Sequence, residues 1–147
     1  MYKVFFDTSV LFSAFYSSSG ASAKLVSLVK SKYILGITTQ TVIEELEENV
    51  HKIKNIDKKD IQQLIVKNNL LVRDAITLSE IKSYADIVDK KDTHVLAGAI
   101  LTECDYLVTL DKKHLDNPKV KSKIKRTKII SPKELLQIIM LKYPRDD

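Results

Sequence analysis

Two aspartates follow apolar segments, at positions where a carboxylate can do chemistry. Asp7 comes directly after Val4, Phe5 and Phe6, and Asp111 ends the segment DYLVTLD. If both segments are parallel strands, the two carboxylates emerge at the same edge of a sheet, where ligands bind in such folds. Each aspartate also has a plain structural interpretation: Asp7 can cap a turn or short helix that begins at Ser9, and Asp111 can be an ordinary loop residue.

Asp92 adds a third carboxylate, near the start of a predicted helix. At about 100° per residue, Asp92 falls on the same helix face as Val95, Leu96 and Ala99. A capping box with Asp89 would explain an acid in the first turn. It would not require the side chain to point towards the core, where an unpaired charge is unfavourable. We therefore interpret Asp92 as a functional residue.

The segment EELEE, residues 44–48, offers a fourth carboxylate. The apolar face of its predicted helix is formed by Val42, Ile43, Leu46 and Val50. Glu44 and Glu48 point away from that face and are interpreted as solvated, whereas Glu45 and Glu47 lie at its two borders. Only a border position can both leave the core and reach a cleft, and periodicity does not choose between the two.

Four carboxylates at one edge of a sheet would repel one another. Two unit charges about 4 Å apart repel by about 4 kcal/mol at an effective dielectric constant of about 20, so protons or a divalent cation must compensate. Ligation by oxygen alone favours Mg²⁺ or Mn²⁺ over zinc. The histidines, at positions 51, 94 and 114, are too scattered for ligand spacing and are interpreted as surface residues. A hard metal indicates phosphate-ester chemistry, because the ion polarises a phosphoryl oxygen and lowers the pKa of a bound water.

The elements that must position these residues alternate along the chain. Periodicity and turn residues predict strands at 3–6, 33–38, 70–73, 105–109 and 127–130, and helices near 21–31, 40–51, 58–68, 77–86, 90–102 and 132–142. The last helix has the clearest start, because Ser131, Pro132 and Glu134 supply an N-cap, a favoured first residue and the acid of a capping box. Alternating strands and helices indicate an α/β fold with a mainly parallel sheet covered on both faces.

Composition limits the class of protein. A chain of 147 residues, 44% hydrophobic and 29% charged, fits one globular domain. Cys104 is the only cysteine, which excludes an intramolecular disulfide and a cysteine-based zinc site. No apolar run reaches the ~20 residues of a membrane span, and no signal peptide is recognisable. We expect a cytoplasmic protein without a membrane partner.

The net charge of +5 is concentrated near the C-terminus. The segment KKHLDNPKVKSKIKRTK, residues 112–128, holds eight Lys or Arg against one acid, Asp116. Such a run can be a solvated loop that keeps the protein soluble. It can also be a track for phosphates, whose affinity comes from counterion release and falls steeply with salt.

Three segments of the chain resemble the PIN domain: FFDTSVLFSAF, TTQTVIEELEENV and DKKDTHVLAGAILTECDYLVTLDKKHL. The likeness runs from Tyr2 to about Leu141, ends in KIISPKELLQII, and is strongest to the small VapC-like toxin components of toxin–antitoxin pairs. It implies one PIN-like nuclease domain over residues 1–147, folded as a three-layer α/β/α sandwich around a sheet of four or five strands. The implied activity is metal-dependent hydrolysis of RNA phosphodiesters, with a cognate antitoxin and a homodimer as possible assemblies.

The resemblance also implies a role for each matched residue. The family motif carries over onto Asp7, Glu45, Asp92 and Asp111, which settles the choice between Glu45 and Glu47. In the implied mechanism the three aspartates and Glu45 bind Mg²⁺ or Mn²⁺, with Glu45 helping to bind or orient the attacking water. The supporting residues, which would hydrogen-bond the ligands or a metal-bound water, are Thr8, Ser9 and Thr109.

The chain departs from the family pattern just beyond Asp111. Many members carry a further acid two residues later, where this chain has Lys113, and this argues against a second tightly bound metal. We predict that the basic side chains here contact RNA instead; they are Lys112, Lys113, Lys121, Lys123, Lys125 and Arg126.

Two other functions fit parts of the sequence. A phosphoacceptor signalling domain would use Asp74, after the strand LLVR, with Thr109 as its switch residue, but it would need an acidic pair after the first strand and a Lys–Pro after the last, and both are missing. An RNA-binding module that has lost catalysis is the other alternative. A nucleotide-binding dehydrogenase is disfavoured, because Gly20, Gly36 and Gly98 form no glycine-rich loop.

Overall fold

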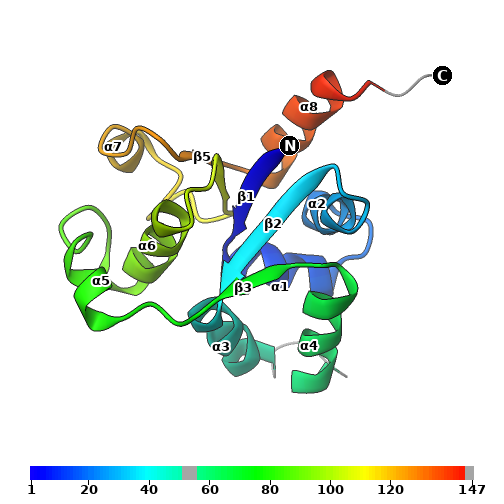
Figure 1. The fold of residues 1–147 in the computed structure, drawn as a ribbon, viewed down its shortest axis with the longest axis horizontal. Helices are drawn as coiled ribbons and strands as arrows, with labels where there is room; N and C mark the ends of the chain where they lie inside the picture. Colours follow the sequence, from blue (N-terminus) through cyan, green and yellow to red (C-terminus); the bar gives the residue numbers. More distant parts are fainter. Residues whose placement is uncertain (51–55, 145–147) are drawn as a thin grey trace.

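Five parallel strands form the sheet that positions the acidic residues. In the computed structural model, which describes residues 1–50 and 56–144, their order is β3-β2-β1-β4-β5 (Figure 1). The strands are β1 (Tyr2–Phe6), β2 (Ile34–Thr39), β3 (Leu71–Arg73), β4 (Tyr106–Val108) and β5 (Lys128–Ile130). Every neighbouring pair is parallel, and β1 lies at the centre, with Phe5 opposite Ile37 of β2 and Leu107 of β4.

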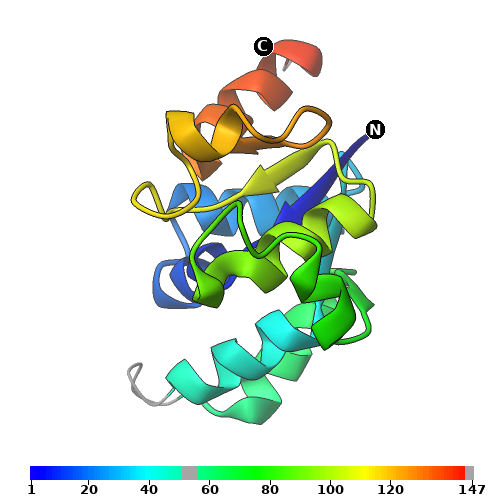
Figure 2. The same ribbon diagram turned by 90° about the vertical axis from the view of Figure 1, so that its left-hand side faces the viewer.

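Helices cover both faces of this sheet. They are α1 (Thr8–Tyr16), α2 (Ala21–Lys30), α3 (Gln40–Asn49), α4 (Lys58–Lys67), α5 (Leu78–Lys82), α6 (Thr93–Leu101), α7 (Pro118–Lys121) and α8 (Pro132–Lys142), with a 3-10 turn, η2 (Lys90–Asp92), before α6. α2 packs against α1 and α8 on one side, whereas α6 crosses β1, β2 and β4 on the other. Figure 2 shows α3 and α4 at one end of the molecule and α8 at the opposite end. The three-layer α/β/α prediction is confirmed, with a sheet that is entirely parallel.

Burial on both faces explains the apolar sequence of β1. Val4, Phe5 and Phe6 are all fully buried, and Leu107 and Val108 of β4 are buried beside them. Parallel strands that helices cover on both sides have continuously apolar sequences, rather than sequences in which apolar and polar residues alternate. The central strands are therefore rigid, and polar residues begin only where each strand ends.

The strand order creates a switch point between β1 and β4. From β1 the chain moves to β2 and β3 on one side, and then crosses over to β4 and β5 on the other. In open α/β sheets, ligands bind outside the carboxyl ends of the strands at such a point. Asp7 follows β1, and Thr109 and Asp111 follow β4, so the predicted site lies at this crevice.

One short element, α7, was not expected from the sequence, one was expected only as an alternative, and two differ in length. α7 is a single turn capped by Asn117, and α1 is the helix that Asp7 could cap, beginning at Thr8 rather than at Ser9. The helix expected over 77–86 is limited to α5, and the one expected over 90–102 is divided into η2 and α6. His51, at the end of the helix predicted over 40–51, lies outside the described residues.

Within residues 1–50 and 56–144, every helix is too short or too polar to cross a lipid bilayer.

Candidate active site

Asp7 is a buried carboxylate held by three donors. It is 6% exposed, its Oδ1 accepts a hydrogen bond from the Thr8 amide (2.7 Å), and its Oδ2 accepts from Ser9 Oγ (3.0 Å) and Thr109 Oγ1 (2.6 Å). Burial raises the pKa of Asp7 above its ordinary value, although these hydrogen bonds act in the opposite direction. Asp7 is also the N-cap of α1, so the capping role and the position at the sheet edge occur together.

Two hydroxyl groups connect the end of β1 to the end of β4. The Leu110 amide donates to Ser9 Oγ (3.1 Å), and the Asp111 amide donates to Thr109 Oγ1 (3.1 Å). Because the same hydroxyls donate to Asp7, the loop that carries Asp111 is fixed relative to the carboxylate of Asp7. These contacts give Ser9 and Thr109 a positioning role.

Asp92 stands between η2 and α6, with 19% of its side chain exposed. Burial raises its pKa to about 6, and the negative charges of Asp111 and Asp7 add to the rise, while His114 lowers it. Neither Asp89 nor Asp92 accepts a capping hydrogen bond, so the capping-box alternative is wrong. The carboxylate points to the other acids instead of to the helix backbone.

Asp111 hydrogen-bonds His114 at the edge of the site. It accepts hydrogen bonds from the His114 amide (2.9 Å), and its Oδ2 lies 3.1 Å from His114 Nδ1. The same nitrogen is 3.9 Å from Asp92 Oδ2, and Nε2 is 3.2 Å from Asp89 Oδ2. In the described part of the chain, Asp89, Asp92 and His114 form the one group whose possible ligand atoms all lie within 4.8 Å of one another.

His114 is partly exposed at the surface, as predicted, but the prediction that the histidines are too scattered for ligand spacing is wrong for this residue. Its side chain is 36% exposed and contacts three carboxylates. The imidazole lies among three carboxylates that would otherwise face only one another, and like charges in such a group repel. The Asp-x-x-His spacing of Asp111 and His114 was the signal that could have revealed the contact.

Glu45 approaches the site from α3 and contacts a second histidine. Its Oε2 accepts from Thr8 Oγ1 (3.2 Å), and its Oε1 makes an ion-pair contact with His94 Nε2. Glu47, at the other border of α3, instead faces Lys58 at 3.9 Å. The structure therefore brings Glu45, and not Glu47, towards the end of β1.

His94 was also expected at the surface, and it is only 7% exposed. Its Nδ1 is buried without a hydrogen-bond partner in the described residues. Every residue of α6 from Thr93 to Ala99 is buried, because this helix is covered all round. A helix that is apolar on every side has no polar face, and the run VLAGAIL carried that information.

The predicted RNA-binding side chains differ in their surroundings. Lys113 and Lys123 line a pocket beside His114, whereas Lys121 forms an ion pair with Asp116 (2.6 Å) and lines another pocket next to Ile124. Arg126 lies 3.5 Å from Glu103. Lys112 and Lys125 are exposed, so two of the six predicted cations are already paired.

Comparison with protein families identifies the family of this chain. The model for the PIN domain matches residues 3–113, which is more than half of the chain and includes all four predicted acids. This chain belongs to the PIN domain family. The family shows a nuclease-type fold, and PIN domains are generally metal-dependent nucleases.

A solved structure agrees with the PIN fold. The crystal structure of PAE2754 from Pyrobaculum aerophilum superposes with a TM-score of 0.63 over 95% of this chain and 96% of that one, at 16% sequence identity. At this identity the likeness concerns the fold alone. No curated protein matches the chain in sequence.

Among the described residues, the group whose ligand atoms converge, Asp89, Asp92 and His114, shares only Asp92 with the predicted metal ligands, but its chemistry fits the divalent metal that a PIN domain implies. Asp7, Asp92 and Asp111 present carboxylates from three elements, and burial, with a smaller contribution from neighbouring acids, raises the pKa of Asp7 and Asp92. A hard cation bound here would favour the ionised form of these carboxylates. His114 beside Asp89 and Asp92 adds a nitrogen to an otherwise oxygen-only set, as Mn²⁺ accepts more readily than Mg²⁺ does.

Asp74 is exposed and follows β3, so it lies at the same carboxyl edge of the sheet as Asp7 and Asp111. However, β3 is an edge strand that is separated from β1 by β2, and it does not border the β1–β4 switch point. The geometry gives the phosphoacceptor alternative no support.

Proposed function

We propose that this protein is an endoribonuclease that uses Mg²⁺ or Mn²⁺ to hydrolyse RNA phosphodiesters. The observation that carries the proposal is the set of buried and half-buried aspartates at the β1–β4 switch point of a PIN fold. A basic segment starts directly after the last of them, and phosphates are its natural partners.

Each acidic residue has a position that suits one task. Asp7, Asp92 and Asp111 would hold the metal, which when bound supplies charge stabilisation and an acidified water. Asp7 is fixed by Thr8, Ser9 and Thr109, so its carboxylate needs little reorganisation to act as a ligand. This rigidity lets the protein keep repelling carboxylates together until a cation arrives.

Glu45 suits the handling of a water. It hydrogen-bonds Thr8 and contacts His94, and it comes from a different element than the three aspartates. A carboxylate in this place can accept a proton from an attacking water or orient it. His94 would keep the carboxylate of Glu45 from turning into the acidic cluster.

The deciding experiment is cleavage of a mixed panel of RNAs by purified protein with Mg²⁺, Mn²⁺ or EDTA. Asp7→Asn should abolish cleavage without loss of folding, and Glu44→Gln, an exposed acid on α3, serves as the matched control. Cutting by wild type and control, and none by Asp7→Asn, would support the nuclease. Salt-sensitive RNA binding with no cutting under any condition would favour the non-catalytic RNA-binding module.

The biological setting is a further part of the proposal. The motifs resemble those of toxin components, so we propose a cytoplasmic toxin with a cognate antitoxin and a homodimeric state. Light scattering of the purified protein tests the dimer. Growth arrest on expression, absent for Asp7→Asn, tests the toxin.

A further inference from the structure

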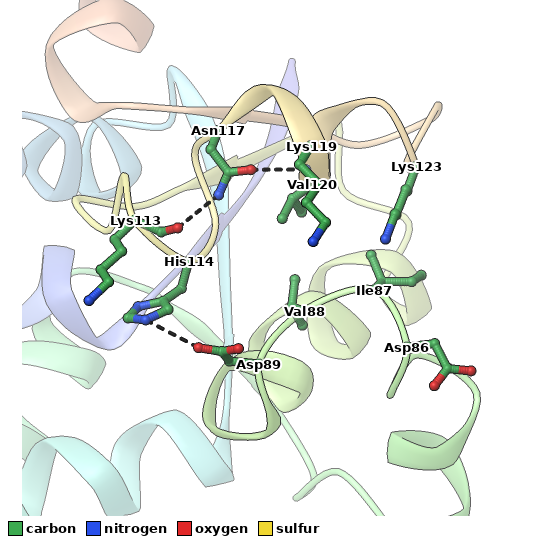
Figure 3. Close-up of a pocket in the computed structure, with 10 residues that line it drawn as sticks. All are labelled: Asp86, Ile87, Val88, Asp89, Lys113, His114, Asn117, Lys119, Val120 and Lys123. Atoms are coloured by element: carbon green, nitrogen blue, oxygen red, sulfur yellow. Dashed lines mark hydrogen bonds and ion pairs between the residues drawn. The ribbon is translucent and has the colours of Figure 1, made fainter.

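A pocket opens directly beside the acidic cluster. It has a volume of about 290 Å³ and lies between two segments, residues 86–89 and 113–123 (Figure 3). Asp89 and His114 belong to its lining, and His114 Nδ1 is 3.1 Å from Asp111 Oδ2. One side chain therefore separates the pocket from a predicted metal ligand.

The segment from Asn117 to Lys123, which we call the α7 lip, is firmly built. Asn117 Nδ2 donates to the Lys113 carbonyl (3.0 Å), and its Oδ1 accepts from the Val120 amide (3.0 Å). Val120 of the lip and Leu115 just before it are buried in the core, with exposures of 4% and 0%. The lip lies beyond residue 113, where the family match ends, so it is a feature of this chain outside the matched pattern.

The lining divides into a basic side and an acidic side. Lys119 and Lys123 extend from the α7 lip over Val88 and Ile87, Lys113 stands near His114, and Asp86 lies at the far end (Figure 3). Among the described residues, none of the three lysines forms an ion pair. Their charges are thus available to an anion, whereas Asp86 and Asp89 keep phosphates away from the opposite side.

The middle of the pocket is apolar. Ile87, Val88 and Val120 contribute its aliphatic wall, and all three also pack against the protein core. A volume of about 290 Å³ is at the small end for ligand pockets. One nucleotide, with its base against the aliphatic wall and its phosphate at the lysines, matches both the size and the distribution of charge.

We propose that this pocket binds one unpaired nucleotide of single-stranded RNA next to the bond that is cut. The inference rests on the proposed function, because the position of the cut is set by the acidic cluster. A base can enter such a pocket only when it is out of a helix, which is how proteins recognise single-stranded RNA. The phosphate is recognised by Lys119 and Lys123. Of these two lysines, only Lys123 was predicted from the sequence to contact RNA.

The test uses Lys119→Ser/Lys123→Ser, with Lys24→Ser/Lys30→Ser as the control. The control removes the same charge from exposed positions of α2, on the other side of the sheet. Binding of a fluorescent single-stranded RNA is measured with Mg²⁺ in the Asp7→Asn background, which keeps the RNA intact, over a series of KCl concentrations. Losing the contacts to this one phosphate should reduce the magnitude of the slope of log K against log salt by about 0.7, which is about fourfold in affinity at about 0.15 M salt. The control should leave the slope unchanged.

Competition separates a nucleotide pocket from a general phosphate site. A mixture of the four nucleoside monophosphates should displace the RNA from the parent protein at concentrations where inorganic phosphate does not. Any of three results would overturn the inference. Inorganic phosphate could compete as well as the nucleotides do, both lysine double variants could lose the same amount of RNA affinity, or duplex RNA could bind as strongly as single-stranded RNA.

The outcome is independent of whether the nuclease proposal holds. If the wild type cuts RNA and Lys119→Ser/Lys123→Ser cuts it equally well, the pocket assignment fails and the nuclease stands. If no RNA is cut but the lysine pair controls single-strand binding, the nuclease fails and the pocket stands.

Discussion

Replacing Asp92 with asparagine should stabilise the metal-free protein and remove its response to metal. The pKa of Asp92 is about 6, against an ordinary value of 3.8. A difference of about 2 in pKa corresponds to about 3 kcal/mol of unfavourable interaction with the ionised form. Because the carboxylate is partly open to solvent, screening reduces this to about 1–2 kcal/mol. For a domain of this size the melting temperature should rise by roughly 2–8 °C.

The stability that Asp92→Asn gains over the wild type should depend on pH in a definite direction. A raised pKa means that, between about pH 4 and about pH 6, folded Asp92 holds a proton that the unfolded chain has already released, so its contribution to stability falls as pH rises through that window. Asparagine does not titrate. The advantage of Asp92→Asn should therefore be small near the lower limit and complete at neutral pH.

Thermal unfolding is measured at two pH values, about pH 4 and neutral pH, in EDTA and in Mn²⁺, with Glu44→Gln as the control. At a metal concentration about 100 times the Kd, the wild type should gain about 2.7 kcal/mol, and Asp92→Asn should gain far less. Two results would refute the reasoning that ionised Asp92 destabilises the folded protein. In EDTA at neutral pH, Asp92→Asn could be less stable than wild type, or its stability advantage could be the same at both pH values.

Three other substitutions test neighbouring parts of the structure. Gly98→Ala should destabilise the fold by about 1–2 kcal/mol in urea titration, although alanine favours helices, because its Cβ would lie 2.7 Å from the ring of Phe5; an unchanged midpoint would show that the ring can move. Thr109→Val should weaken Mn²⁺ binding measured by calorimetry, since Asp7 loses its shortest hydrogen bond, and unchanged affinity would count against a positioning role. His94→Leu should lower kcat more than KM in RNA cleavage, with partial recovery in His94→Gln, whereas equal losses in both variants would indicate a packing role alone.

The sequence predicted best what burial and strand order determine. Asp7 and Asp111 were predictable because they follow apolar strands, and parallel strands end at the same edge. The helical period of the apolar residues indicated on which face of the predicted helix Asp92 lies. Glu45 and Glu47 were indistinguishable on the wheel because both lie at borders, and the difference depends on the neighbours that tertiary packing supplies, Lys58 for one and Thr8 for the other.

The histidines and the pocket could not be found in the same way. His94 lies in the part of α6 that is buried all round, so a polar side chain there did not mark a surface position. His114 belongs to a loop, where no period operates, and the α7 lip is a single turn too short to have one. Lys121 looked equivalent to its neighbours in sequence, yet Asp116 pairs with it. Each case depends on which side chains meet in three dimensions.

The placement of Asp111 after β4 has a consequence for protein synthesis. β4 pairs with β1 and β5, and it is the fourth of five strands to leave the ribosome. Chains lengthen at about 5–20 residues per second and fold as units, so a nascent chain spends several seconds with Asp7 and Glu45 already made but Asp111 absent. During that time the metal cannot be held by all three aspartates. A protein that cuts RNA would in this way stay inactive towards the message and ribosome that are producing it.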